Sequence, residues 1–387
     1  MNKRLGLRII LASATLLAAI GVAWIFSLPA TPDPGAAPPI ETQETDAMLA
    51  ALKPPKRERP LIAIIGINEG TEVTDYLMPY GILKRTDVAD VVALATEPGP
   101  LRLYPALQVE PDATIAQFDA QYPDGADYIV VPAMSRDDDP AALTWIRGQA
   151  GKGAIVIAVC AGVKVAGEAG LLDNKRATTH WYFVDELRDR VPSLHYVADR
   201  RLVADQGIAT TTGISASMPM MLTLIESIAG RDKAMAVARD LGLSTWDARH
   251  NSSAFKITRA FAATVLGNVL AFWKRDQLGI ELVAGMDEVS LAIVADAWSR
   301  TYRSSTVTFA SSADAVDSRS GLRIIPDRVA TEWPDEQLVP AFADRKPAEA
   351  LDQALFQIGA RYGDRIARVV AMQLEYPRRE VPREENQ

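Results

Sequence analysis

The sequence is poor in cysteine and histidine. Among its 387 residues there is one cysteine, Cys160, and there are three histidines. A single cysteine excludes an intramolecular disulfide, and so few thiol and imidazole groups argue against a structural zinc site. We therefore expect neither a bound metal nor another cofactor.

The sequence also lacks an excess of basic residues. It has 41 Lys and Arg against 49 Asp and Glu, which gives a formal net charge of −8. Nucleic-acid binding requires a clustered basic face, so nucleic acid is not an expected partner. The length exceeds that of an ordinary single core, which predicts more than one domain.

One long hydrophobic run is present, near the N-terminus. Residues 9–28 carry no charge and are long enough to cross the hydrocarbon core of a bilayer. Lys3, Arg4 and Arg8 precede the run, which places the N-terminus in the cytoplasm. We predict a single-pass anchor at residues 1–28 in the inner membrane, with the rest of the chain in the periplasm. A cleaved signal peptide is the alternative.

A change of composition follows the hydrophobic run. Residues 29–59 are rich in proline and acidic residues and predict a semi-extended tether. From Pro60 onward, apolar runs typical of strands buried on both faces alternate with helical patterns. The apolar runs are residues 61–67, 90–96, 126–133 and 154–160. This alternation predicts an α/β domain over residues 60–243, a flavodoxin-like parallel sheet sandwiched by helices.

The C-terminal part carries a weak internal repeat. Shifted by 215 positions, residues 70–112 align with residues 285–327 without a gap, and Gly70 meets Gly285. A second alignment is shifted by 133 positions and pairs Gly230 with Gly363. Because the two shifts differ, the second copy lacks the middle of the domain, including any counterpart of Cys160.

The repeat sets the remaining domain boundaries. We predict a helical linker at residues 244–283, formed by one long amphipathic helix after a polar turn. A smaller, truncated repeat of the same domain then occupies residues 284–387.

Cys160 ends a buried strand and is followed by two small residues, Ala161 and Gly162, and then by a helical pattern. This strand–turn–helix order is that of a nucleophile elbow, with Cys in place of Ser. Unpaired N–H groups at the start of the helix favour a thiolate and are suited to hold a developing oxyanion. The alternative is a buried cysteine that fills a small gap.

Two segments around the cysteine carry a family resemblance. They are AVCAGVKVAGEAGLLDNKRATTHW, residues 158–181, and LVADQGIATTTGISASMPMML, residues 202–222. They resemble the ThiJ/PfpI family of the class I glutamine amidotransferase-like superfamily. Within that family they are most similar to isonitrile hydratases and to the sensor domains of AraC-type regulators. The resemblance covers residues 60–245.

The resemblance implies a role for several residues of this chain. Cys160 matches the elbow cysteine, and Asp75 matches an acidic residue that hydrogen-bonds the thiol. Ala161, Gly70 and Gly213 match positions whose backbone lines the pocket. His180 matches an accessory histidine that is often badly oriented for proton transfer.

A carboxyl group beside a thiolate should keep its own proton, because two adjacent anions repel. Asp75 is then suited to deliver that proton to a substrate. A capping or surface carboxylate is the alternative for Asp75, and a structural or interface role is the stronger alternative for His180.

Ala161 is also where the sequence departs from the family. Peptidase-like members have His directly after the cysteine, and isonitrile hydratases usually have Thr. Proteolysis is therefore disfavoured, and hydratase activity is in doubt. The chain also carries no helix-turn-helix domain like that of the regulators.

Three functions stay open. The first is an enzyme that acts on a small electrophile by hydratase or glyoxalase-like chemistry. The second is a small-molecule or redox sensor without catalysis, and the third is a structural protein. The repeat raises one further hypothesis, that the truncated copy imitates a partner subunit in an intramolecular pseudo-dimer. A homodimer is the alternative.

Overall fold

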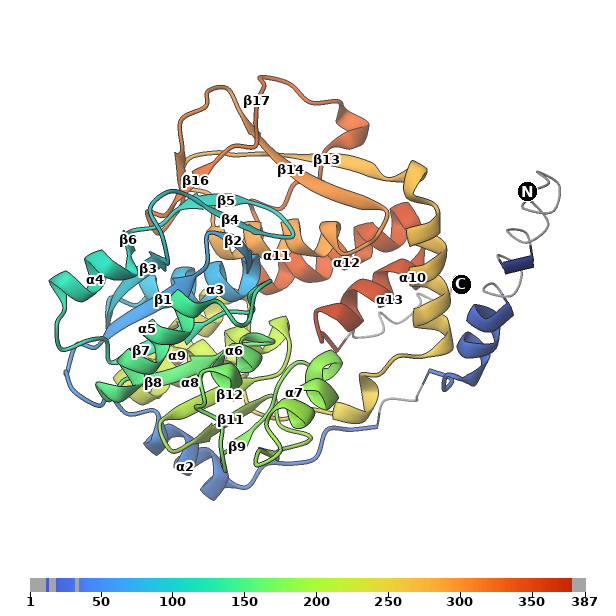
Figure 1. Cartoon of the computed structure of the whole chain (residues 1–387). Coiled ribbons are helices and arrows are strands. Elements are labelled where there is room, and N and C mark those ends of the chain that lie inside the picture. The colour runs from blue at the N-terminus through green and yellow to red at the C-terminus, as the bar shows by residue number, and fades with distance from the viewer. Residues whose placement is uncertain (1–11, 14–18, 32–34, 378–387) are drawn as a thin grey trace, which may run out of the picture.

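A seven-stranded sheet forms the centre of the molecule (Figure 1). The computed structural model describes residues 12–13, 19–31 and 35–377. The strands follow the order β11-β12-β8-β7-β1-β3-β6. They are β1 Leu61–Gly66, β3 Asp90–Ala95, β6 Ala113–Thr114, β7 Tyr128–Val131, β8 Ile155–Ala158, β11 Leu202–Asp205 and β12 Ile208–Thr211. All neighbours pair in parallel except β11 and β12, which are antiparallel, so the sheet is mixed rather than parallel throughout as predicted.

Helices cover both faces of this sheet because successive side chains of each strand point to opposite sides. In β1, Ile62 and Ile64 belong to one apolar cluster, and Ala63 and Ile65 belong to the other. The first face packs on α3 Val73–Lys84, α8 Ser217–Ala229 and α9 Arg231–Leu241, and the second on α4 Ile115–Gln121, α5 Pro140–Gly151, α6 Gly162–Glu168 and α7 Val184–Arg190. The fold is thus α/β and flavodoxin-like.

The remaining elements are short or belong to the C-terminal part. The short ones near the main sheet are β9 Arg176–Ala177, β10 His195–Tyr196, η1 Trp181–Phe183, η2 Ile214–Ala216 and η3 Ser252–Ala254. The C-terminal part has β13 Asp276–Glu281, α11 Glu288–Ser299, β14 Ser304–Ala310, β17 Arg328–Val329, η5 Asp335–Gln337, α12 Pro347–Tyr362 and α13 Asp364–Gln373. A five-stranded sheet connects the two parts in the order β15-β16-β5-β4-β2. Its strands are β2 Glu69–Glu72, β4 Leu101–Tyr104, β5 Gln108–Glu110, β15 Val316–Asp317 and β16 Arg323–Ile325.

Elements of the C-terminal part repeat those of the main domain at a constant spacing. The first residues of β1 and β13, α3 and α11, β5 and β16, and β6 and β17 are each 215 positions apart. The last residues of α8 and α12 are 133 positions apart, as are the first residues of α9 and α13. Between β17 and α12 the chain forms only η5, so this part has no counterpart of β7, β8 or α6.

The two parts contact each other through equivalent surfaces. Helix α3 packs against α11, and β5 pairs antiparallel with β16 so that Val109 is opposite Ile324. These residues are themselves 215 positions apart. A contact in which each copy offers the same surface to the other is the arrangement of a two-fold dimer.

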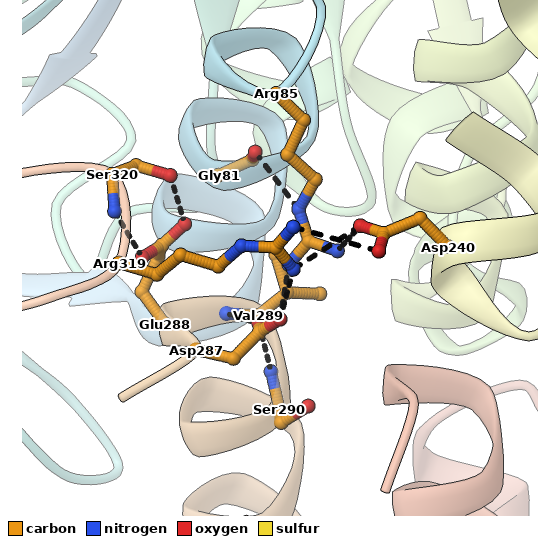
Figure 2. Close-up of polar contacts among 9 residues, drawn as sticks. All are labelled: Gly81, Arg85, Asp240, Asp287, Glu288, Val289, Ser290, Arg319 and Ser320. Atoms are coloured by element: carbon orange, nitrogen blue, oxygen red, sulfur yellow. Dashed lines mark hydrogen bonds and ion pairs between the residues drawn. The ribbon is translucent and has the colours of Figure 1, made fainter. Parts of the chain in front are cut away.

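Side-chain contacts at this junction repeat in the same reciprocal way. Arg85, near the end of α3, binds Asp287 at the start of α11 with an N···O distance of 2.5 Å (Figure 2). Arg300, directly after α11, binds Glu72 at the start of α3 at 2.8 Å. Each residue is 215 positions from its counterpart, so the contact is pseudo-two-fold in its side chains as well.

Two predicted segments differ from expectation. Within the predicted tether, residues 42–51 form helix α2 Thr42–Ala51, and Leu52 behind it is fully buried. Its carbonyl accepts a hydrogen bond of 2.7 Å from Tyr128, which holds the segment on the main domain. The predicted linker helix is also shorter than expected: within residues 244–283 the chain forms the turn η3, helix α10 Arg259–Leu270 and the turn η4 Phe272–Lys274, and β13 begins at Asp276.

Most of the predicted anchor, residues 1–28, lies outside the described residues. Residues 19–27 are helical and project away from the body of the molecule (Figure 1). In the part of the chain that the structure describes, no helix combines the length and the apolar character needed to cross a membrane.

Candidate functional site

Cys160 lies in a strained turn between β8 and α6. Its backbone φ is +55°, a left-handed conformation that non-glycine residues rarely adopt. The turn is tight because Gly162 packs on the neighbouring strand. A Cβ atom at Gly162 would lie 2.1 Å from the carbonyl oxygen of Val131. The sequence therefore produces the elbow geometry that the small residues predicted.

Two threonines hold the turn in place. The Cys160 N–H donates to Thr211 Oγ1 at 3.0 Å, and Thr179 Oγ1 donates to the Cys160 carbonyl at 3.0 Å. Cys160 is only 4% exposed. The elbow is thus a rigid, closed position rather than an open one.

Asp75 lies in the first turn of α3 and is fully buried. Its Oδ2 atom accepts the N–H of Ala133 at 3.1 Å. Its Oδ1 atom is buried and has no hydrogen-bond partner among the described residues, so the hydrogen bond to the thiol that the resemblance implied is not formed. Burial raises the pKa of Asp75 well above its usual range, and the charge of Glu72 raises it further. The carboxyl group therefore favours its protonated form, which the sequence predicted on grounds of charge repulsion.

Burial is also the largest influence on the thiol. It raises the pKa of Cys160, and the charges of Asp75 and Glu72 act in the same direction. The N–H of Ala161 lowers the pKa of Cys160, as predicted for the start of a helix, but this effect does not overcome burial. A negative charge on Asp75 therefore opposes ionisation of the Cys160 thiol.

A cation from the C-terminal part approaches this pair. Arg300 donates to Asp296 at 2.6 Å and to Glu72 at 2.8 Å, and its positive charge lowers the pKa values of both Asp75 and Cys160. Burial raises the pKa of Asp296 to about 7, despite the opposing charge of Arg300. The site thus combines a buried thiol with three acidic side chains and one arginine.

Sequence reasoning missed Arg300 and the two carboxylates that it binds, Asp296 and Glu72. One signal for Arg300 was available, because the shift of 215 positions pairs it with Arg85. No pattern in the sequence indicated that the two copies exchange these arginines across their junction.

Backbone groups occupy both ring nitrogens of His180. Its Nε2 lies 2.9 Å from the carbonyl oxygen of Gln373, and its Nδ1 accepts the N–H of Tyr182. Burial lowers the pKa of His180. Both ring nitrogens are therefore engaged in a neutral imidazole, which is the structural role that was the stronger alternative.

Gly213 lies beside His180 under the end of α13. Its N–H donates to Glu375 Oε2 at 2.6 Å, and a Cβ atom there would lie 2.5 Å from Glu375 Cβ and 2.8 Å from His180 Cδ2. Glu375 also accepts the N–H of Trp181 and lies 2.8 Å from His250 Nε2. The C-terminal part thus closes the loop that flanks the cysteine, and Glu375 is a further residue that the sequence did not reveal.

Gly70 lies in β2 and contacts Ser135. Its φ is +85°, and a Cβ atom would lie 2.4 Å from Ser135 Oγ. Its carbonyl accepts the N–H of Ser135. The glycine therefore shapes the turn that leads into Glu72 and Asp75, and the structure gives it no direct role at the thiol.

Metal-binding groups and surface cavities are two features that can mark a binding site. In the described ranges, no group of three or more His, Cys, Asp or Glu side chains is arranged to hold a metal ion. Two surface cavities of about 310 and 540 Å³ are lined by residues of α2 and β11 and by residues near α7. None of the predicted site residues lines either of them.

Fold and site together define a class: a flavodoxin-like α/β protein with a buried cysteine on a strained elbow and a buried acidic side chain, Asp75, whose charge acts on the thiol. Residues 62–227 match the model of the DJ-1/PfpI family. The chain is 33% identical over 172 residues to an isonitrile hydratase of Pseudomonas putida, an alignment that covers 43% of this chain and 72% of that protein. The chain belongs to the DJ-1/PfpI family, as the resemblance predicted.

The chain is also similar to other proteins. Protein dj-1beta of Drosophila melanogaster is 23% identical over 46% of this chain and 95% of its own length. The transcriptional regulator CdhR of Pseudomonas aeruginosa is 29% identical over 32% of this chain and 37% of its own length. The crystal structure of Drosophila melanogaster DJ-1beta aligns with 48% of this chain and 100% of its own, with 22% identity and a TM-score of 0.44.

Proposed function

We propose that Cys160 and Asp75 form a thiol–carboxyl pair that adds to a small electrophilic metabolite, such as an aldehyde or an isonitrile. The observation that carries the proposal is the unpaired Oδ1 atom of Asp75, buried in electrostatic reach of a thiol on a strained elbow. A buried polar atom without a partner is costly, and such atoms are often retained for function.

The pair is suited to addition because it shares one negative charge. When the thiol is ionised, Asp75 keeps its proton, and Arg300 supports the single charge. With an aldehyde, the thiolate sulfur forms a bond to the carbonyl carbon, and the carbonyl oxygen takes the proton from Asp75. Burial of the pair strengthens electrostatic stabilisation of the charge that develops on the carbonyl oxygen.

Two residues, Ala161 and His180, limit the class of substrate. Ala161 offers no side chain for proton transfer, and His180 is neutral with both nitrogens engaged. A thiol–imidazole dyad for proteolysis is therefore not favoured. The similarity to an isonitrile hydratase supports a small electrophile, although Ala161 replaces the Thr usual in those enzymes.

A sensing module without catalysis is the second candidate. It is favoured by the 4% exposure of Cys160 and by the closure of its flanking loop under Glu375. In this function the thiol would react once, by oxidation or by binding a metabolite, and the C-terminal part would respond to the change.

The two candidates are distinguished by counting turnovers with an α-oxoaldehyde. An enzyme consumes many equivalents per protein, whereas a sensor retains one equivalent or less. Cys160→Ala is the control, and consumption that persists in that variant would exclude both candidates.

The role of Asp75 is tested by the pH dependence of Cys160 alkylation. If a protonated Asp75 supports the thiolate, Asp75→Ala moves the alkylation profile to higher pH. Asp75→Asn stays closer to wild type, because its amide can still donate a hydrogen bond. A profile that moves to lower pH in Asp75→Ala would identify Asp75 as a charged neighbour that opposes ionisation and would refute the proposed pair.

We also propose that the protein acts at the periplasmic face of the inner membrane, anchored by residues 9–28. The charge-free run and the preceding basic residues support this topology. A periplasm-specific reporter fused after residue 60 should be active, and a cytoplasm-specific reporter at the same position should not.

Finally, we propose that the C-terminal part is a built-in partner subunit. The reciprocal contacts of Arg85 with Asp287 and of Arg300 with Glu72 support this interpretation. One copy then keeps the elbow, and the other supplies the arginine and the closing end of α13.

A further inference from the structure

Helix α10 and the turn η4 expose a continuous apolar surface. The residues of this surface, which we call the α10 patch, are Leu266, Val269, Leu270, Phe272 and Trp273. Their exposed fractions range from 39% to 69%. Isolated apolar residues are common on protein surfaces, but adjacent large ones mark a contact with a partner or a membrane.

The orientation of α10 is the reverse of that in an ordinary surface helix. No charged residue occurs between Arg259 and Lys274. The buried side carries Asn268, whose side chain donates to the carbonyl of Thr301 at 3.1 Å. A helix at a protein–water boundary turns its apolar side inward. In α10 the polar side chain of Asn268 faces the protein, whereas Leu266 and Leu270 face outward.

The end of the N-terminal hydrophobic run lies at the start of this helix. The Arg259 N–H donates to the carbonyl of Pro29 at 3.0 Å, and Arg259 Nε donates to the carbonyl of Leu28 at 2.6 Å. Leu28 is the last residue of the charge-free run. Figure 1 shows α10 along the edge of the molecule from which the N-terminal helical segment projects. The 12 residues of α10 extend about 18 Å, so the α10 patch begins close to the predicted exit from the bilayer.

We propose that the α10 patch lies in the interfacial layer of the lipid bilayer, as a second membrane contact beside the anchor. Leucine, valine and phenylalanine side chains would enter the acyl-chain boundary, and Trp273 would lie at the level of the headgroups, where tryptophan is enriched. Lys274 and Arg275 follow directly and are exposed, which suits them to anionic phosphates. This inference rests on the proposed anchor but not on the chemistry of Cys160.

Membrane contact of this kind would also orient the candidate site. Helix α10 packs against α13, and residues at the end of α13 contact the loop that flanks Cys160. A bilayer-bound α10 therefore holds the closing end of α13 at a set position relative to the membrane surface.

Two labelled variants of the full chain test the proposal. In a Cys160→Ala background, Leu270→Cys and Phe356→Cys each carry an environment-sensitive NBD dye. Both parent side chains are 61% exposed, but Phe356 lies on α12 rather than in the α10 patch. The proteins are reconstituted into vesicles of phosphatidylethanolamine and phosphatidylglycerol, and unchanged thermal unfolding shows that each variant is folded.

The expected result is a blue-shifted emission at position 270 that acyl-brominated lipids quench several-fold more than at position 356. Equal, water-like emission and equal quenching at both positions would overturn the proposal. A blue shift at position 270 that grows with protein concentration and is insensitive to bromine would overturn it in favour of a second copy of the chain.

Flotation of the same vesicles separates this inference from the proposed anchor and function. If the protein floats with the vesicles but position 270 is not quenched, the anchor stands and the docking of α10 is wrong. If the protein does not float, both membrane proposals are wrong. Alkylation of Cys160 in the unlabelled wild type reports on the thiol chemistry independently of either result.

Discussion

At the scale of single residues, burial determines which side chains of the site carry a charge, because a buried environment disfavours charged forms. Glu72 and Asp296 bind one arginine, whose charge also acts on Asp75, and the pKa values of Asp75 and Cys160 are both raised by burial. The unusual feature is that the compensating cation, Arg300, comes from a part of the chain that has no cysteine of its own.

The first prediction concerns stability and Asp75. Its folded pKa is raised above the unfolded value, so the native state holds a proton that the unfolded chain releases. The stability linked to this proton is fully present below the unfolded pKa and is lost as the pH rises through the folded pKa. Asp75→Asn has no proton to release, so it does not show this decrease in stability as the pH rises. We expect its melting temperature, relative to wild type, to increase from pH 5 to pH 8.

Differential scanning calorimetry at several pH values measures this effect, with the exposed Asp344→Asn as a control. Parallel curves for wild type and Asp75→Asn would mean that Asp75 titrates normally.

The second prediction concerns Arg300 as a positioning residue. Arg300→Lys keeps the charge but loses the planar fork that binds Glu72 and Asp296 together. We expect alkylation of Cys160 at pH 7 to slow by roughly three- to tenfold and its pH profile to move upward.

Arg85→Lys is the matched control for Arg300→Lys, because it alters the pseudo-symmetric contact with Asp287 (Figure 2). It should reduce stability to a similar extent without moving the alkylation profile. If both variants moved the profile equally, Arg300 would act through the junction as a whole rather than through the thiol site.

At the scale of elements, the elbow depends on the close approach of α6 to β7. Gly162 begins α6, and a Cβ atom there would lie within 2.8 Å of the carbonyl oxygens of both Val131 and Pro132. Backbone atoms cannot move aside as a flexible side chain can. The position of Cys160 therefore depends on Gly162 having no side chain.

The third prediction follows from this contact. Gly162→Ala should destabilise the protein by about 1–3 kcal/mol or more, because overpacking forces the backbone of two elements apart. Gly148→Ala is the control: Gly148 is an exposed helical position with nothing near its Cβ site, and it should gain up to about 1 kcal/mol from helix propensity. Urea unfolding measures both, and equal midpoints for the two variants would contradict the close approach.

At the scale of the whole molecule, the surface of α3 is already occupied. Helix α11 packs on it, and β16 pairs with the edge strand β5 of the main domain. A second chain cannot use the same surface while the C-terminal part is in place.

The fourth prediction is therefore that the full-length protein is monomeric in detergent. Light scattering coupled to chromatography should give a protein mass near 42.0 kDa. A symmetric dimer that is broken by a charge-reversal variant on α3, such as Lys84→Glu, would contradict the built-in partner.

Local patterns were sufficient for the central fold and for the position of Cys160. Buried strands and intervening helices are encoded by short apolar runs, and an elbow needs small residues directly after its nucleophile. These features depend on neighbours in the chain, so the sequence alone predicted them. The antiparallel β11 was missed because its direction depends on where the chain returns in space.

The tertiary structure alone decided the electrostatics and closure of the site. Arg300 lies more than 200 positions from its partner Glu72, and Glu375 lies 162 positions from Gly213. The folding of residues 42–51 into α2 and the end of α10 at Leu270 depend on packing against distant elements in the same way. A charge or a buried contact across such separations has no local signature in a single sequence, because it is specified only when the two copies of the repeat pack against each other.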